Sequence, residues 1–326
     1  MAEAAAVAAG LLAVCVVARV LVGSTAVGFP EGVAWWRVAG VRLERVWPAV
    51  LVGASLALSG LALQGLLRNA LAEPFVLGLA SGAGLGAAVQ ATIGASLGVW
   101  PGPLYLGATA GSAGALALVY TLGRRRGEID PLGLLLAGVV VGTIAGSGVM
   151  LVRALAGSDV LRETIARWMM GHLDASAGWG RLIAVGVVTA AGGAWLWRVG
   201  RWLDAASLGR EEALALGVPL GRLRAGLLGV SSLLAAGAVV LAGPVAFVGL
   251  IAPHAARMVI GPGHRGLAVV CPFVGAALVV GADAAAAGVS LGLGIGELPI
   301  GVVSAVLGGP VFLVMLRRYL AGQGDV

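Results

Sequence analysis

Residues 63–86 read LQGLLRNALAEPFVLGLASGAGLG, and a short polar cluster separates two apolar stretches. The polar residues of this cluster are Gln64, Arg68, Asn69 and Glu73, and the next charged residue is Arg124. A membrane-spanning helix needs roughly 20 apolar residues, because about 30 Å of hydrocarbon is crossed at about 1.5 Å per residue. The uncharged run that follows Glu73 is therefore long enough for two membrane spans.

The composition of the whole chain agrees with a membrane protein. Of its 326 residues, 60% are hydrophobic and 11% are charged, whereas soluble domains carry about 25% charged residues. A soluble protein with a large core is excluded, because the uncharged runs are long and recur along the chain.

The apolar runs predict an all-α membrane protein of one domain, residues 1–326, with about ten transmembrane helices. Backbone groups in lipid must be satisfied within the segment, which favours helices. Gly243 and Pro244 divide the region 225–260 into two pieces, because proline breaks a continuous helix, so nine or eleven spans remain alternatives. The predicted spans are 4–24, 46–67, 75–97, 102–123, 131–156, 182–200, 226–243, 245–260, 266–287 and 298–316.

The distribution of arginine predicts the orientation of the chain in the membrane. All 21 basic residues are arginine. With the N-terminus inside, 13 fall in cytoplasmic segments and 7 in outer segments, and Arg19 lies in the first span. Cytoplasmic loops carry an excess of basic residues, so we expect a multi-pass protein of the cell (inner) membrane with both termini in the cytoplasm. The net charge of +6 then needs no nucleic-acid partner.

The 55 glycines often lie four residues apart, as in Gly78, Gly82 and Gly86, or in Gly107 and Gly111. Small residues on one helix face let two backbones approach closely in a membrane. Tight packing within one subunit and a sliding or dimer interface are both open. The two cysteines and three histidines show no metal-ligand spacing, so we expect no metal site, no cofactor and no catalytic residue.

The absence of lysine excludes a phosphate-binding P-loop, which needs a lysine at the phosphates. Uphill transport would therefore be driven by an ATPase on another chain or by an ion gradient. Ion-coupled carriers bury ionisable groups at mid-membrane, and here the candidates are Asp283, near the end of its predicted span, and Glu297. This scarcity favours a partner ATPase over an ion-coupled secondary carrier.

Several segments, in order, resemble the FecCD family, the permease subunits of ABC importers for iron-siderophores, haem and vitamin B12. The stretch 53–87 is similar to the family's Q-x-x-x-x-N-P-L-A-x-P-x-x-L-G motif, with Ala70 in place of its proline. Four further segments match in order: RWMMGHLDASAGW (167–179), GREEALALGV (209–218), GPVAFVGLIAPHAAR (243–257) and ELPIGVVSAVLGGPVFLVMLRR (297–318).

This resemblance implies a type II ABC importer permease that works as a homo- or heterodimer on two ATPase subunits, with a substrate-binding protein outside and lipid around it. Residues 204–224 would form the cytoplasmic coupling loop. The chain itself would not be an enzyme, because ATP is hydrolysed on the partner. The coupling residues implied are Leu208, Gly209, Glu211, Ala213, Leu216 and Gly217.

The resemblance also implies a cytoplasmic gate at Asn69 and Leu71, although Asn69 could equally end its helix by bonding free backbone groups. On the outer side, Arg42 and Arg45 would dock glutamates of the substrate-binding protein, unless they are solvated interfacial charges. Iron-siderophore is the cargo expected from the family's commonest substrate, with haem and vitamin B12 as alternatives.

Overall fold

The computed structural model describes residues 2–23, 27–28, 34–97, 104–125, 128–156, 159–173 and 177–323. Helices fill most of these ranges, and two two-residue strands pair as a small hairpin. The elements in chain order are α1 (Ala2–Leu21), α2 (Trp35–Leu67), η1 (Pro74–Leu77), α3 (Leu79–Ser96), α4 (Tyr105–Leu122), β1 (Arg124–Arg125), β2 (Glu128–Ile129), α5 (Pro131–Leu155), α6 (Asp159–Met169), α7 (Trp179–Leu208), α8 (Arg210–Ala215), α9 (Leu220–Ala242), α10 (Val248–Ile260), α11 (His264–Leu293) and α12 (Ile300–Gln323).

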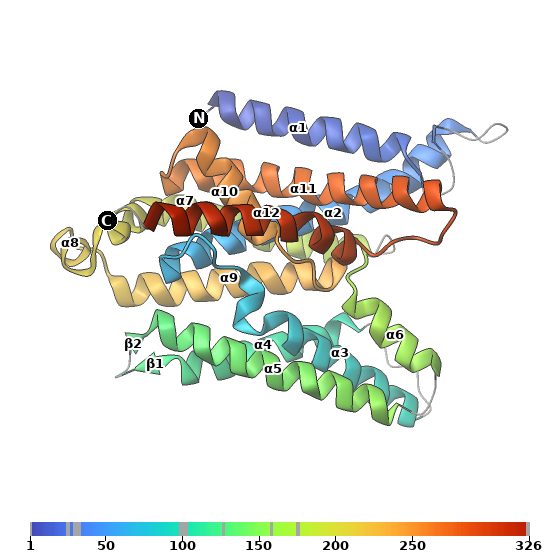
Figure 1. Ribbon diagram of the computed structural model, residues 1–326, viewed down its shortest axis with the longest axis horizontal. Helices are drawn as coiled ribbons and strands as arrows, with labels where there is room; N and C mark the ends of the chain where they lie inside the picture. Colours follow the sequence, from blue (N-terminus) through green and yellow to red (C-terminus); the bar gives the residue numbers. More distant parts are fainter. Residues whose placement is uncertain are drawn as a thin grey trace.

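The long helices lie side by side along one axis of the molecule (Figure 1). Each of the ten predicted spans corresponds to one of them, and the all-helical membrane fold is confirmed. Among the described residues, eight helices are long and apolar enough to cross a membrane. The other two predicted spans correspond to α3, which is rich in glycine, and α10, which has 13 residues.

Helix α2 occupies the centre of the bundle and packs against α7, α9, α10 and α11. Glycines bring its backbone close to two of these neighbours, since a Cβ added to Gly53 or Gly60 would lie within 2.2 Å of a backbone oxygen. Hydroxyl pairs join it to the other two, with Ser55 bonded to Thr189 and Ser59 to Ser231. The core is therefore built from close backbone contacts and short hydrogen bonds, as expected where lipid removes the hydrophobic incentive.

The glycines spaced by four serve packing within the subunit where α3 meets α4. Gly82 and Gly86 of α3 face Gly107 and Gly111 of α4, and an added Cβ at Gly86 would lie 1.9 Å from the carbonyl oxygen of Gly107. Gln90 accepts a hydrogen bond from Gly107 N–H at 2.6 Å. Together with α5 and the short α6, these helices form one side of the molecule (Figure 1).

Three of the element boundaries that differ from the prediction bear on the sites described below. Helix α2 begins at Trp35, eleven residues before the predicted span, because Arg42 and Arg45 are paired within the protein and do not end the helix. Helix α10 begins at Val248 after the non-helical segment 243–247. Helix α11 continues to Leu293, so that Asp283 lies ten residues inside the helix and not near its end.

Candidate functional site

The predicted coupling loop forms a sharp elbow at one end of the bundle, which we call the α8 end. Helix α1 begins and α12 ends at this same end (Figure 1). Gly209, with φ +157°, separates α7 from α8, and Gly217, with φ +75°, ends the turn after α8. Asp204 accepts hydrogen bonds from the backbone N–H and the ring of His264, and so fixes the last turns of α7 against the start of α11.

The surface of this elbow is apolar in part and acidic in part. Ala213 is fully buried, and its carbonyl accepts the N–H of Val218 at 2.9 Å, which closes the turn after α8. Leu208 and Leu216 are 68% and 64% exposed, and Glu211 is exposed between them. The predicted amphipathic helix is thus short, and the leucines in and beside it, Leu208, Leu214 and Leu216, are all exposed.

A hollow of about 290 Å³ lies beside this elbow. Arg210, Leu214 and Pro219 line one part of it, and Ile129 of β2 lines another. Arg224 donates a hydrogen bond to the carbonyl of Ile129 at 3.2 Å, which ties the β-hairpin to α9. The α8 end therefore combines a protruding leucine pair with an adjacent basic hollow.

Asn69 and Leu71 lie in the connection between α2 and η1. The Asn69 side-chain oxygen accepts the N–H of Leu71 at 2.9 Å, and Asn69 N–H bonds to the carbonyl of Gln64. Arg68, with φ +49°, ends α2 in the left-handed region. Within this subunit Asn69 serves the local turn, and both Asn69 and Leu71 are half-buried; their role as a gate between subunits stays a prediction.

The end of α2 and the connection 68–78 are bonded to α10 and to the residue before it by groups that the sequence alone did not bring together. Gln64 accepts a hydrogen bond from Arg257 at 2.5 Å, while its amide nitrogen lies 3.4 Å from the carbonyl of Gly249. The carboxylate of Glu73 accepts the N–H of Phe247. Both pairs join the motif around 63–78 to the motif around 243–257, so the two motifs form one structural unit.

Arg42 and Arg45 lie near the opposite end of the bundle, and each is 8% exposed. Arg42 donates to the carbonyls of Val20 and Leu21 at 2.7 and 3.0 Å and caps the end of α1. Both guanidinium groups have partners within the subunit, so the structure places them differently from freely exposed docking arginines. Their docking role stays a prediction.

Arg45 belongs to a cluster of buried charges. It donates to Asp283 at 3.1 Å and to Glu297 at 2.6 Å, and Arg19 donates to the other oxygen of Asp283. Asp283 is 1% exposed. The imidazole of His172 lies 3.8 Å from Glu297. The cluster therefore links α1, α2, α11 and the segment before α12.

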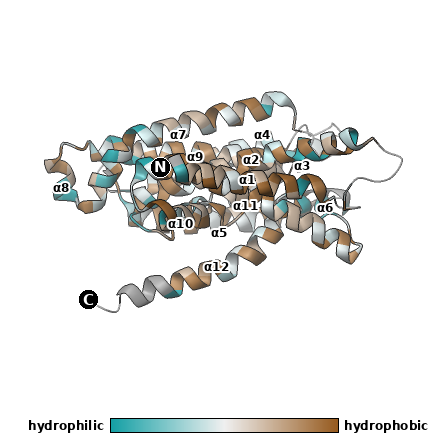
Figure 2. Ribbon diagram, turned by 90° about the horizontal axis from the view of Figure 1, so that it is seen from above, coloured by the Kyte–Doolittle hydropathy of each residue, from teal (hydrophilic) through white to brown (hydrophobic). Residues whose placement is uncertain are grey.

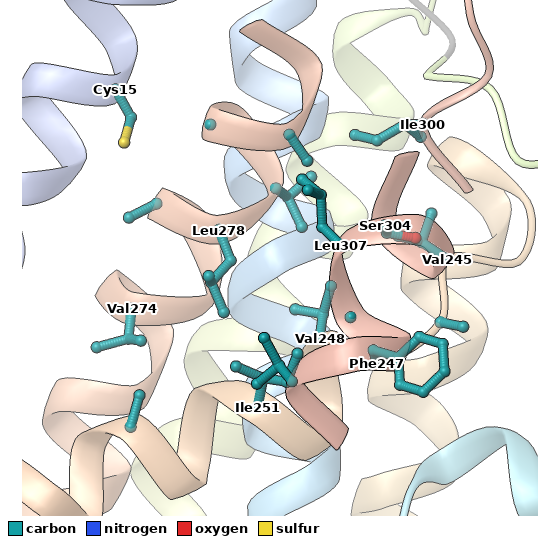
Figure 3. A pocket seen from close by; sticks show the side chains of 18 of the residues that line it. Cys15, Val245, Phe247, Val248, Ile251, Val274, Leu278, Ile300, Ser304 and Leu307 are labelled. Carbon is teal, nitrogen blue, oxygen red and sulfur yellow. The ribbon is translucent and has the colours of Figure 1, made fainter. Parts of the chain in front are cut away.

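An apolar cavity of about 460 Å³ lies between α1, α10, α11 and α12 (Figure 3). Cys15 lines it from α1, Leu278 from α11, and Ser304 and Leu307 from α12. Phe247 and Ile251 line it from the start of α10. Within the described ranges, no three His, Cys, Asp or Glu side chains come together as metal ligands would.

Comparison with known proteins places the chain among transport proteins. The model of the FecCD transport family matches residues 11–318. The cobalamin import system permease protein BtuC of Halobacterium salinarum is 37% identical over 89% of this chain and 75% of the relative. The hemin transport system permease protein HmuU of Yersinia pestis is 35% identical over 87% of this chain and 84% of the relative.

A solved structure agrees with these relatives. It is described as an inward-facing conformation of a metal-chelate type ABC transporter, with 29% sequence identity and a TM-score of 0.83. The match covers 97% of this chain and 99% of that chain. Since the family model extends over nearly the whole chain, the protein belongs to the FecCD transport family.

Proposed function

We propose that this chain is the permease subunit of a binding-protein-dependent ABC importer, which moves its cargo by alternating access at a dimer interface. The observation that carries the proposal is the α8 elbow, which presents Leu208, Glu211 and Leu216 at the end where α1 begins and α12 ends. A partner groove can take such a protruding apolar edge. Gly209 and Gly217, at the two ends of the elbow, would let it move with the ATPase subunit.

The second subunit would cover surface that this chain leaves exposed on α12. Val306, Leu313 and Val314 are each more than half exposed. Helix α12 diverges from the rest of the bundle toward its C-terminal end (Figure 2). A helix held so lightly by its own subunit is suited to shift between two arrangements, which alternating access requires.

The substrate-binding protein would dock at the opposite end, near Arg42, Arg45 and the exposed Glu44. Because both arginines are paired inside the subunit, docking through them would require these bonds to be exchanged for bonds to the partner's carboxylates. The cargo would be an iron-siderophore, with haem or vitamin B12 as the alternatives carried by relatives. Binding of a ferric hydroxamate, haemin and cyanocobalamin to the cognate binding protein, measured by fluorescence quenching, separates these three.

An ion-coupled carrier is the competing function. It would need a buried carboxylate that binds and releases an ion. Asp283 is the buried acidic side chain among the described residues, and two arginines hold it. Its charge is already balanced, which supports the ATPase-driven reading.

The test of the proposal is the affinity of the permease for its ATPase subunit. Replacing Leu208 and Leu216 together with alanine should weaken ATPase binding about tenfold or more, because truncated interface anchors cost about 1–2 kcal/mol or above. Met258→Ala, which truncates a 70% exposed side chain on α10, serves as the matched control and should bind like the parent. Equal affinity in all three proteins would contradict α8 docking.

A further inference from the structure

Phe247 has an uncommon backbone conformation for a bulky residue. Its φ is +69°, and Arg68 is the other non-glycine residue with positive φ among the described residues. Left-handed geometry at a large side chain persists only where the surrounding structure determines it. The contacts of Phe247 therefore indicate what this conformation serves.

On its backbone side, Phe247 is held by the segment that follows α2. Its N–H donates to the carboxylate of Glu73, while its carbonyl accepts the N–H of Ile251 at 2.8 Å and begins α10. Pro74 packs on the same turn, since a Cβ added to Gly249 would lie 2.8 Å from the proline Cδ. The position of the connection 68–78 thus determines the direction in which the Phe247 ring points.

On its side-chain side, Phe247 contacts α12. A Cβ added to Gly308 would lie 2.5 Å from Cβ and 2.6 Å from Cγ of Phe247, so the glycine leaves a notch that the phenylalanine fills. The ring also lies beside Phe312, with centroids 6.2 Å apart. The left-handed backbone of Phe247 directs its ring toward α12, and the missing side chain of Gly308 leaves the space that the ring occupies.

Nearer its N-terminus, at Gly301, helix α12 also contacts the non-helical segment 243–247. A Cβ at Gly301 would lie 2.9 Å from the carbonyl oxygen of Pro244 and 2.2 Å from that of Met170. The cavity beside Phe247 leaves space between α12 and the helices α1 and α11 (Figure 3). The segment 243–247 therefore supports α12 at Gly301 and Gly308, and the neighbouring cavity leaves room for α12 to change position.

We infer that Phe247 is a positioning residue that transmits the position of the connection 68–78 to α12, with Glu73 fixing its backbone and Gly308 receiving its side chain. This inference rests on the proposed function in one respect, because it makes α12 the helix that shifts during transport. In physical terms, a displacement of Glu73 changes the Phe247 backbone and tilts the ring, and the ring moves α12.

The test measures the position of α12 directly. Spin labels are attached at Val314→Cys on α12 and Val187→Cys on α7, both exposed positions, in a chain with Cys15→Ala and Cys271→Ala. Labelled chain is diluted with unlabelled chain in lipid nanodiscs, so that distances within one subunit dominate. Gly308→Ala should shift the mean distance by several ångströms, because the new methyl group collides with Phe247.

Gly309→Ala is the matched control, because nothing lies within 4 Å of a Cβ added to Gly309. It should leave the distance unchanged. Phe247→Gly keeps the left-handed backbone without strain and removes the ring, and it should broaden the distance distribution even if Gly308→Ala fails to fold. Equal shifts in Gly308→Ala and Gly309→Ala, or an unchanged distribution in Phe247→Gly, would overturn the inference.

Two substitutions of Glu73 distinguish a positioning role from a general loss of packing. Glu73→Gln keeps a side-chain oxygen that can accept the Phe247 N–H, so its distances should match the parent. Glu73→Leu has no acceptor and should shift α12 in the same direction as Gly308→Ala. A parent-like distance in Glu73→Leu would contradict the transmission.

The distance measurement needs neither the ATPase subunit nor cargo, so its outcome is independent of the proposed function. In the reconstituted importer, Glu73→Leu should lower the uptake rate more than tenfold while ATPase binding through α8 stays at the parent value. If the parent protein fails to bind an ATPase, the proposed function fails. If the distances in Glu73→Leu and Gly308→Ala equal those of the parent, the Phe247 inference alone fails.

Discussion

Asp283 is almost fully buried and accepts hydrogen bonds from two arginines. Arg19 and Arg45 donate to its separate oxygens, and Arg45 extends the pairing to Glu297. Taking an unpaired charge out of water is costly, and removing one partner of a buried pair leaves the other uncompensated. The pairing of Asp283 with Arg19 and Arg45 therefore holds the end of α1 and the first half of α2 against α11.

Asp283→Asn should destabilise the protein by about 3–5 kcal/mol, because two buried guanidinium groups lose their shared counter-charge. Glu297→Gln should cost less than about 1 kcal/mol, because the Glu297 side chain is 44% exposed and solvent screens its pairing with Arg45. Thermal unfolding in detergent, followed by circular dichroism, compares the two variants. Equal losses would show that Asp283 is not the centre of the cluster.

Pairings of this kind set the limit of prediction at the residue scale. The sequence identifies Arg45 and Asp283 as charged residues near apolar runs, but 238 positions separate them. The pairing depends on how α2 and α11 are placed side by side, and no local pattern reports that placement. The same holds for Glu73 and Phe247, which lie 174 positions apart in two different motifs and are joined by a hydrogen bond only in the folded chain.

At the scale of elements, glycine decides how closely helices approach. On α4, a Cβ at Gly111 would lie 2.0 Å from the carbonyl oxygen of Gly82, whereas one at Gly114 would meet nothing within 4 Å. The predicted role of the Gly-x-x-x-Gly spacing in tight packing is confirmed for α3 and α4. It does not extend to every pair, since Gly292 and Gly296 also lack neighbours within 4 Å.

Gly111→Ala should destabilise the α3–α4 pair by about 1–3 kcal/mol, because the added methyl group overpacks a backbone contact that cannot yield. Gly114→Ala on the same helix gains the same helix propensity, up to about 1 kcal/mol, without a clash. It should therefore be neutral or slightly stabilising in the same unfolding assay. A destabilisation of similar size in both variants would refute the packing role of the α3–α4 glycines.

The ten apolar runs could be located from the sequence because lipid imposes length and polarity on each helix separately. Several helix boundaries that could not be predicted depend on other segments. Pairing of Arg42 and Arg45 lets α2 begin at Trp35. The short helix η1 is folded against α5 and α9, and the first turn of α10 depends on Glu73.

At the scale of the whole molecule, the two ends of the bundle have different chemistry. The α8 end carries the exposed leucines of the elbow and the arginine-lined hollow beside it. The opposite end buries Arg19, Arg42 and Arg45 among carboxylates and carbonyl groups. Between them lie the apolar helices and the apolar cavity beside α12. The molecule is therefore suited to respond to partners at its ends.

The most direct measurement is cargo uptake by proteoliposomes that contain the permease with or without its ATPase subunits. The binding protein, loaded with its identified cargo, is supplied on the side of the vesicle membrane where it docks on the permease. We expect accumulation against a gradient only with ATPase subunits and ATP present, and no effect of an ionophore that collapses proton and sodium gradients. Accumulation by the permease alone, abolished by the ionophore, would contradict the account.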